Sequence, residues 1–339
     1  MRNKLFMAIF LLLVSIGIHG KAFAIAFGTD FAGKYTDLDL GSVPGLPTSY
    51  GGLTFKPGDP NTIWIGGNAN TANGRIYEIG VTRNATNHIT GFSGTATSIG
   101  NVGEYNDGGV TVGPGGVLFT SRWPVNELGQ TKPGDTDESK IIDLAALGVA
   151  GSHAAINFVP AGFDGAGQMK LVSWSGGQWY TGNFSQDGSG TFDLLSVTQE
   201  TTIGGGPEGF VYIDGINLGF TVDSLLVAEW SAGNVAAYAI DSNGDPIVSS
   251  RRDFITGLSG AEGAAIDPLT GDFLFSTFGG GNHVVAIQGF VPPPPPPNPG
   301  VVPEPATLLL LCIGLAGVIF RVKRDRSSSR LFYQRAEAS

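Results

Sequence analysis

A seven-residue pattern that recurs five times constrains the fold of this chain more than any other feature. Each copy starts with two residues that are small or acidic, continues into a short apolar run and ends at proline or aspartate. The copies align without gaps at residues 51–57, 108–114, 154–160, 208–214 and 262–268. Because their starts lie 57, 46, 54 and 54 residues apart, the chain is predicted to repeat one supersecondary unit of roughly 50 residues.

Two further apolar runs follow each copy and complete the repeated unit. The second runs lie at residues 62–65, 117–120, 170–174, 224–230 and 272–278, and the third at 75–81, 140–144, 178–184, 234–240 and 283–288. The chain has 53 glycines, and turn pairs such as Asn-Gly separate the runs. This pattern predicts an all-β fold, with residues 140–149 as the only helix-like stretch of the repeats.

Three or four strands per repeat, with small residues on the first strand, are typical of β-propeller blades, because the innermost strands crowd around a central channel. We therefore predict a β-propeller of about five blades over residues 25–290. Six blades remain possible if the second or third repeat conceals a divergent one, and a β-sandwich is the alternative fold. The last repeat ends after three strands, so the alternating segment 34–40 is predicted to add the fourth strand and close the ring.

The starts of the repeats carry the best candidates for a site. Asp107, His153, Glu208 and Glu262 lie at or beside the first aligned position, and these positions converge on one mouth of a propeller channel. Glu208-Gly209 and Glu262-Gly263 resemble the Glu-Gly pair that gluconolactonase-like propellers use as a calcium or zinc ligand. These four side chains are candidate metal ligands, with calcium as the possible ion. The alternative is that they are solvated or cap backbone amides.

Two weaker signals accompany this candidate site. Trp123, Trp174, Trp230 and Phe278 follow or end the second run of a repeat, so they are predicted either to form an aromatic rim that stacks sugars or to pack between blades. Residues 241–245 resemble the start of a calcium loop but lack the distal glutamate, so an ordinary hairpin turn is the favoured interpretation.

The negative charge of the predicted propeller region argues against polyanionic partners. Residues 25–305 contain 10 Lys and Arg against 27 Asp and Glu, a net charge of −17. Such acidity argues against nucleic acid and anionic lipid surfaces, which bind through Lys and Arg. The single cysteine, Cys312, lies outside this region, so no disulfide is expected in it.

The N-terminus has the features of a secretory signal peptide at residues 1–24. Arg2 and Lys4 precede an apolar run at 5–18, and Ala22 and Ala24 provide the small residues that signal peptidase needs for cleavage.

The C-terminus carries a second predicted targeting segment. Six consecutive prolines at 292–297 form half of a semi-rigid linker, residues 291–302. An apolar stretch follows at 306–322, long enough at about 1.5 Å per residue to cross roughly 25 Å of hydrocarbon. It is predicted to be one transmembrane helix that leaves residues 327–339 as a cytoplasmic tail. The polar motif before it is Val302, Pro303, Glu304 and Pro305, and the basic cluster after it is Arg321, Lys323, Arg324 and Arg326.

This order of motif, apolar helix and basic stop resembles the PEP-CTERM sorting signal of Gram-negative bacteria, here at residues 303–326. The resemblance implies an inner-membrane-anchored precursor, processing by exosortase, and a product at the cell surface or outside the cell. It also implies a bacterium that makes extracellular polysaccharide or biofilm. No catalytic motif accompanies it. We therefore expect a binding or structural module; the alternative is a secreted metal-dependent hydrolase or lactonase of the propeller type.

Overall fold

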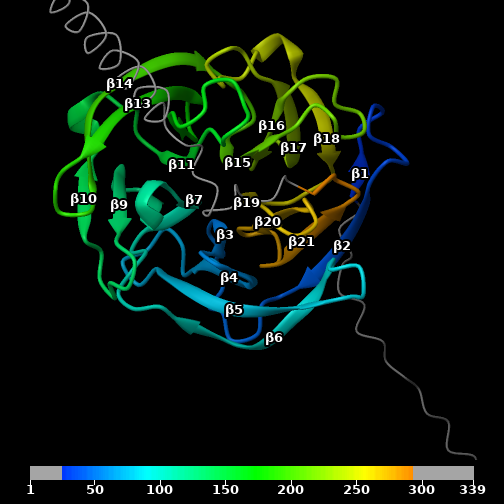
Figure 1. Cartoon of the computed structure of the whole chain (residues 1–339), viewed down its shortest axis with the longest axis horizontal. Helices are drawn as coiled ribbons and strands as arrows, with labels where there is room; N and C mark the ends of the chain where they lie inside the picture. Colours follow the sequence, from blue (N-terminus) through cyan, green and yellow to red (C-terminus); the bar gives the residue numbers. More distant parts are fainter. Residues whose placement is uncertain (1–24, 293–339) are drawn as a thin grey trace, which may run out of the picture. The chain divides into compact units, whose positions relative to one another are not determined.

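The computed structural model describes residues 25–292, which form five antiparallel sheets arranged around a common centre. Figure 1 shows the sheets following one another around the ring in the order of the sequence. Each sheet begins with its innermost strand, which contains one copy of the seven-residue pattern, and continues outward. The prediction of a five-bladed β-propeller is confirmed.

The strands of each blade run from the centre outward. Blade 1 contains β3 (Leu53–Lys56), β4 (Asp59–Gly67), β5 (Arg75–Arg83) and β6 (Ile89–Ser98). Blade 2 contains β7 (Asn106–Val112), β8 (Leu118–Arg122), β9 (Glu127–Thr131) and β10 (Lys140–Asp143). Blade 3 contains β11 (His153–Phe158), β12 (Met169–Ser173), β13 (Gln178–Gln186) and β14 (Phe192–Thr202). Blade 4 contains β15 (Pro207–Ile213), β16 (Ser224–Glu229), β17 (Asn234–Ala239) and β18 (Arg252–Thr256), and blade 5 contains β19 (Ala261–Ile266), β20 (Phe273–Thr277) and β21 (Val284–Gln288).

The N-terminal segment closes the ring, as predicted from the incomplete last repeat. Strand β2 (Thr36–Gly41) pairs antiparallel with β21 and becomes the fourth strand of blade 5. Strand β1 (Ala26–Phe27) adds a short fifth strand to blade 4 by pairing with β18. Because β2 covers β21, the ring joins the beginning of the described chain to its end, which hides a sheet edge.

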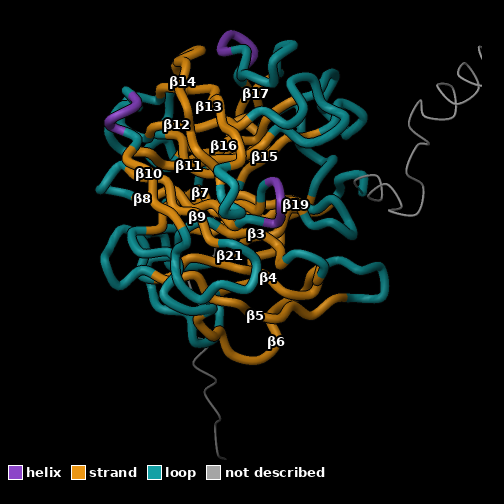
Figure 2. Tube along the Cα trace, turned by 60° about the vertical axis from the view of Figure 1, so that its left-hand side comes forward, coloured by secondary structure: helices purple, strands orange, loops and turns teal. Residues whose placement is uncertain are grey.

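Blade 2 corrects two details of the sequence analysis. The third strand of this blade is β9, and the run assigned to the third position forms β10, the fourth and outermost strand. The helix-like stretch 140–149 therefore begins as a strand and contains only the 3-10 turn η2 (Ala145–Leu147). Strand β9 escaped detection because its sequence, ELGQT, contains one apolar residue, Leu128. The other two 3-10 turns, η1 (Pro114–Gly116) and η3 (Val248–Ser250), also lie in loops (Figure 2).

The hydrophobic core is divided into five clusters, one at each interface between neighbouring blades. Strand β16 shows how one sequence serves two interfaces, because successive side chains of a strand point to opposite faces. Leu225 and Val227 pack toward blade 3, while Leu226 and Ala228 pack toward blade 5. All six residues of β16 are buried, and the four at its centre, residues 225–228, form a continuous apolar run.

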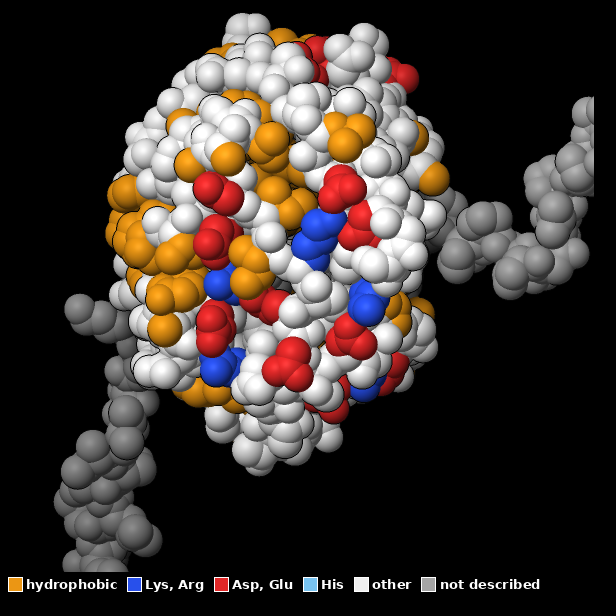
Figure 3. All heavy atoms as spheres, turned by 90° about the vertical axis from the view of Figure 1, so that its left-hand side faces the viewer, with side chains coloured by type: hydrophobic (Ala, Val, Ile, Leu, Met, Phe, Trp, Pro, Cys, Tyr) orange, Lys and Arg blue, Asp and Glu red, His pale blue; other side chains and the backbone are white. Residues whose placement is uncertain are grey.

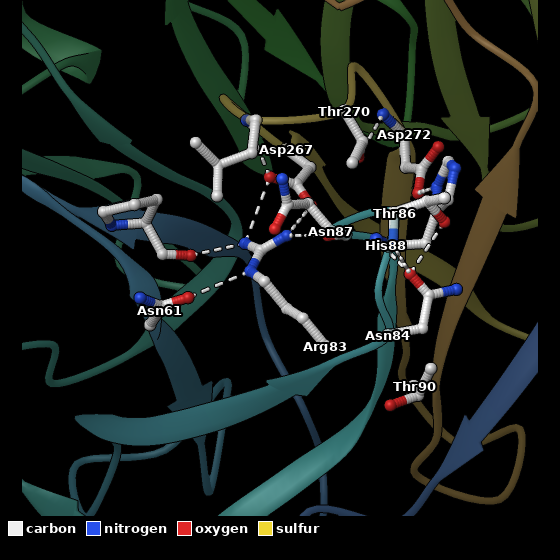
Figure 4. Close-up of polar contacts among 12 residues, drawn as sticks. Asn61, Arg83, Asn84, Thr86, Asn87, His88, Thr90, Asp267, Thr270 and Asp272 are labelled. Atoms are coloured by element: carbon white, nitrogen blue, oxygen red, sulfur yellow. Dashed lines mark hydrogen bonds and ion pairs between the residues drawn. The ribbon is translucent and has the colours of Figure 1, made fainter.

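Buried ion pairs add polar contacts at the interface where the ring closes (Figure 4). Arg83 of β5 donates two hydrogen bonds to the carboxylate of Asp267, at 2.6 and 3.1 Å. Nδ1 of His88 lies 2.7 Å from Oδ2 of Asp272. Both aspartates are fully buried and come from the turn between β19 and β20, so these pairs join blade 1 to blade 5.

On the outer face of the ring drawn in Figure 3, acidic and basic side chains lie next to one another rather than in separate patches. Lys140 of β10 illustrates this, because its Nζ lies 2.8 Å from Asp187 and 2.6 Å from Asp193 of blade 3. The predicted signal peptide, sorting signal, transmembrane helix and tail lie outside the described residues. Within residues 25–292, no helix has the length and apolarity that crossing a membrane requires.

Candidate functional site

Three carboxylates meet at one mouth of the central channel because of irregularities in the innermost strands. In β15, Pro207 pairs with Glu229 and Phe210 with Val227, which leaves Glu208 and Gly209 without direct partners in the ladder. In β19, Glu262 and Gly263 are passed over in the same way between Ala261 and Ala264, and in β7 Asp107 lies between Asn106 and Val110. Such bulges turn side chains away from the regular alternation.

Asp107, Glu208 and Glu262 form a compact buried group. One carboxylate oxygen from each lies within 4.8 Å of the others, and all three residues are at most 5% exposed. Oε2 of Glu208 and Oε1 of Glu262 have no hydrogen-bond partner. Burying charged oxygens without partners is costly, so this group needs protons or a cation.

The pKa values of the three groups reflect this cost. Burial raises the pKa of Asp107 to about 7, although hydrogen bonds with Glu262, Asn70 and the Gly108 backbone act in the opposite direction. Burial and the charge of Asp107 raise the pKa of Glu208 well above its usual range. Burial, followed by the charges of Glu208 and Asp107, does the same for the pKa of Glu262.

Asn70 is a site residue that the sequence analysis missed. It lies in the loop between β4 and β5, with a positive φ of 66° that asparagine tolerates better than most residues. With its amide nitrogen turned toward the carboxylates, it donates hydrogen bonds to Oδ1 of Asp107 at 2.9 Å and to the Asn106 carbonyl at 3.1 Å. The only signal for it in the sequence is its place in a glycine- and asparagine-rich loop, residues 66–74.

Aromatic side chains wall a cavity of about 200 Å³ above the carboxylates. The residues that line it are Asn70, Asp107, Trp123, Trp174, Glu208, Trp230, Glu262 and Phe278. The four aromatic residues each directly follow the second strand of a blade, from blade 2 to blade 5. The rings of Trp174 and Trp230 meet edge to face with centroids 5.9 Å apart, and Nε1 of Trp230 donates to the Phe278 carbonyl at 3.1 Å.

His153 does not lie with the three carboxylates, which corrects the grouping predicted from the sequence. It pairs in the ladder with Ser173, so the position of β11 that is passed over is Ala154 instead. Its Nδ1 lies 3.2 Å from the Glu127 carbonyl and its Nε2 3.1 Å from the Ala155 carbonyl. Burial lowers the pKa of His153 to about 4. The residue that corresponds to Glu208 and Glu262 in blade 3 is thus an alanine, and blade 3 contributes no carboxylate.

Residues 241–245 form a turn, as favoured from the sequence. The Asp241 side chain accepts hydrogen bonds from the backbone amides of Asn243 and Asp245, at 2.8 and 3.0 Å. The Asp245 carboxylate points elsewhere and accepts from Lys170 at 2.5 Å and from Trp179 at 2.8 Å, which joins blade 4 to blade 3.

Comparison with known proteins bears on the C-terminal signal alone. No curated protein matches the chain. A Myxococcus xanthus glutaminyl cyclase covers 75% of this chain and 96% of its own at 10% identity, with a TM-score of 0.44. The PQQ-bound aldose sugar dehydrogenase of Streptomyces coelicolor covers 74% and 83% at 12% identity, with a TM-score of 0.37. At such identities and TM-scores, neither neighbour bears on what this chain binds.

The sorting motif residues Val302, Pro303, Glu304 and Pro305 lie outside the described residues, as do the basic cluster and the signal cleavage residues. The model of the PEP-CTERM protein-sorting motif matches residues 301–324. This motif implies an exported protein with a membrane-anchored precursor and exosortase as its processing partner. The chain is therefore a five-bladed β-propeller that carries a PEP-CTERM protein-sorting motif at residues 301–324.

Proposed function

We propose that this exported protein is a binding module whose ligand site is the acidic mouth of the propeller channel, where Asp107, Glu208 and Glu262 hold a calcium ion. One observation carries the proposal: three buried carboxylates from three blades converge within 4.8 Å, and two of their oxygens have no partner in the protein. A bound cation would supply that partner and offset the mutual repulsion of the carboxylates.

Calcium suits this group better than magnesium or zinc. Calcium binds carboxylate and amide oxygens at about 2.3–2.6 Å, so it spans a group of oxygens up to roughly 5 Å across. Magnesium requires shorter distances and a near-ideal octahedron, and zinc favours nitrogen or sulfur ligands in a tetrahedron. The ligand group offers oxygens alone, from Asp107, Glu208 and Glu262.

The sorting motif implies export, which supports a role at the cell surface or in the extracellular matrix. Outside the cell, calcium is available at concentrations at which weak extracellular sites fill, with Kd values of about 10⁻⁴–10⁻³ M. The aromatic walls of the cavity are of the kind that bind extracellular polysaccharide, and this remains the proposed partner class. Processing by exosortase at the Pro303–Pro305 motif would release the propeller and its site from the membrane.

A metal-dependent hydrolase or lactonase stays the alternative function. Such an enzyme needs a general base within hydrogen-bond reach of an attacking water. Among the described residues, the carboxylates that line the cavity are the proposed ligands of the ion, and the histidines do not line it: His88 pairs with Asp272, His153 contacts backbone carbonyls, and His283 pairs with Asp39. The binding role is therefore favoured over the catalytic one.

Thermal unfolding with and without calcium tests the proposal. We expect 10 mM calcium to raise the Tm of the full chain, purified in detergent, by about 5 °C, because a ligand that binds only the folded state stabilises it by about 1.4–2.7 kcal/mol at a tenfold to hundredfold excess over Kd. Replacing both glutamates, Glu208→Gln and Glu262→Gln, should abolish this rise.

The matched control removes two negative charges elsewhere. Glu104→Gln with Glu200→Gln changes the same atoms in residues that do not line the cavity, and it should keep the full calcium effect. An equal rise in Tm for both double variants would show that calcium binds diffusely to the acidic surface, and the proposed site would be wrong.

A further inference from the structure

The acidic mouth is a blind cavity, because glycines close the channel beneath it. A methyl group added to Gly52 would lie 2.4 Å from the Gly108 carbonyl oxygen, and one added to Gly209 would lie 2.5 Å from the Ala264 nitrogen. A methyl group on Gly263 would meet Gly52 Cα at 2.6 Å. The innermost strands of blades 1, 2, 4 and 5 thus touch through their backbones. A ligand can enter this cavity only from the mouth.

The size of the cavity admits one six-membered ring. An apolar cavity of about 150 Å³ in another protein binds benzene, so a volume of about 200 Å³ holds a single ring of that size with its substituents and not two. Its walls are Trp123, Trp174, Trp230 and Phe278, which offer flat apolar faces, and its floor offers oxygen atoms. A sugar ring has the matching chemistry, with apolar C–H faces and hydroxyl groups around its edge.

A second, more open hollow adjoins the first and shares one wall with it. It is lined by Trp174, Ser175, Gly205, Gly206, Ser231 and Ala232, which belong to the loops of blades 3 and 4. Its two serines and the backbone of its glycines offer hydrogen-bonding groups to a hydrated chain lying along the surface. Trp174 belongs to both hollows, so a ligand that fills the closed cavity can continue past this indole.

We propose that the acidic mouth binds the terminal sugar ring of an oligosaccharide or polysaccharide end-on, through two neighbouring hydroxyl groups that complete the coordination of the calcium ion. The next sugar leaves along the open hollow past Trp174. This inference rests on the proposed calcium site. Calcium takes six to eight oxygen ligands, so three carboxylates leave positions that a pair of hydroxyls can fill.

The unpaired oxygens and the blind end distinguish this arrangement from a groove that holds the middle of a chain. The buried carboxylate oxygens of Glu208 and Glu262 line the closed cavity rather than the open hollow, so the ion and the terminal ring must share that cavity. A polysaccharide without a free end has no ring to insert. The protein would therefore recognise chain ends.

Calorimetry on the calcium-loaded full chain tests this inference, in a detergent without a sugar head group. The probes are linear trisaccharides of glucose, mannose, galactose and N-acetylglucosamine. At least one should bind with a Kd near 1 mM or tighter, and EGTA should weaken that binding at least tenfold. Methylating the hydroxyls of one of its two terminal rings should abolish binding, whereas methylating the other terminal ring should not, and the ring that matters is the one that enters the cavity.

Two substitutions locate the sugar. Trp174→Ala should weaken trisaccharide binding about tenfold while the calcium-induced rise in Tm persists, because stacking on an aromatic face is lost and the carboxylates are intact. Phe55 lines a separate cavity at the other end of the channel, the opposite mouth. Phe55→Ala should therefore leave trisaccharide binding unchanged.

Each of the other possible results contradicts one step of the proposal. If calcium raises the Tm but no trisaccharide binds, the sugar inference is wrong and the calcium site stands. If a trisaccharide binds equally well in EGTA, the ion does not hold the sugar. If methylation of neither terminal ring weakens binding, recognition is not end-on. If calcium has no effect on Tm, the proposed function itself fails.

Discussion

The two mouths of the channel are built by the same five innermost strands, yet they differ in chemistry. The acidic mouth has three buried carboxylates with unpaired oxygens beneath aromatic walls. The opposite mouth opens into a cavity of about 240 Å³ whose walls include Phe55, Val110, Val211, Tyr212 and Ile266. Two of its polar side chains are satisfied, since Thr111 donates to Asn157 at 3.1 Å and Asn157 donates to the Phe210 carbonyl at 2.8 Å.

The regularity of the strands explains this difference. Toward the opposite mouth the ladders of blades 2 to 5 are unbroken, with Val110 opposite Thr120 and Val211 opposite Leu226. At the acidic mouth the ladders skip residues, and the skipped residues include Asp107, Glu208 and Glu262. Bulges of this kind are a means of re-aiming side chains at functional sites. Binding chemistry is therefore expected at the irregular mouth, and packing at the regular one.

The glycines that close the channel between its two mouths should tolerate substitution less well than any other part of the channel. Gly52→Ala should lower the free energy of unfolding by about 3 kcal/mol, because the new methyl group would lie 2.4 Å from the Gly108 carbonyl oxygen and 2.7 Å from the Val110 nitrogen, both backbone atoms. Denaturant unfolding measures the change. Gly204→Ala is the control, since nothing lies within 4 Å of its added methyl group, and its effect should be below about 0.5 kcal/mol. Equal stability of the two variants would show that the channel is not closed here.

His153 directly precedes Ala154, the residue that the ladder of blade 3 skips, and it lies outside the carboxylate group. Its titration should make the free energy of unfolding depend on pH. Its folded-state pKa of about 4 lies below the unfolded value of about 6.5, so the unfolded chain binds the proton more strongly. The stability that neutral His153 provides is fully present above about pH 6.5 and is lost as the pH falls toward 4. Relative to His153→Asn, the wild type should lose about 2.5 kcal/mol between pH 7 and pH 4.5.

Denaturant unfolding of both proteins at several pH values and constant salt measures this difference. The carboxylates titrate in both proteins, so their contribution cancels in the comparison. Parallel stability curves for wild type and His153→Asn would contradict the prediction, because they would mean that His153 is protonated equally in the folded and unfolded states.

One conservative substitution at each mouth gives the smallest effects, which should have opposite signs. In EGTA, Glu262→Gln should raise the free energy of unfolding by about 1 kcal/mol, because it removes a carboxylate that is buried beside two others and that can be neutralised only at a cost in free energy. Thr111→Val at the opposite mouth should lower it by about 1 kcal/mol, because one hydrogen bond is lost. Thr111→Val should keep the calcium-induced rise in Tm and Glu262→Gln should lose it. Destabilisation by Glu262→Gln in EGTA would mean that the carboxylate is already neutralised within the protein.

Much of the fold could be predicted because it depends on local and repeated patterns. The seven-residue pattern identified the five innermost strands, and the missing strand of the last repeat identified β2 as the closing strand. Strand β9 could not be found in this way, because Leu128 is its only apolar residue and its pairing with β8 and β10 stabilises it. The aromatic residues after the second strands were identified because they recur at the same place in repeats two to five.

The sequence alone determined the order of the blades, the closure of the ring and the PEP-CTERM motif at 301–324, because each is carried by residues that are neighbours in the chain or by repeats of one pattern. Only the tertiary structure decided which candidates meet. It placed Asp107, Glu208 and Glu262 within 4.8 Å of one another and turned His153 into the protein between Glu127 and Ala155. The physical reason is that a bulge depends on the pairing of two strands, so the direction of an inner-strand side chain is fixed only when its blade has formed.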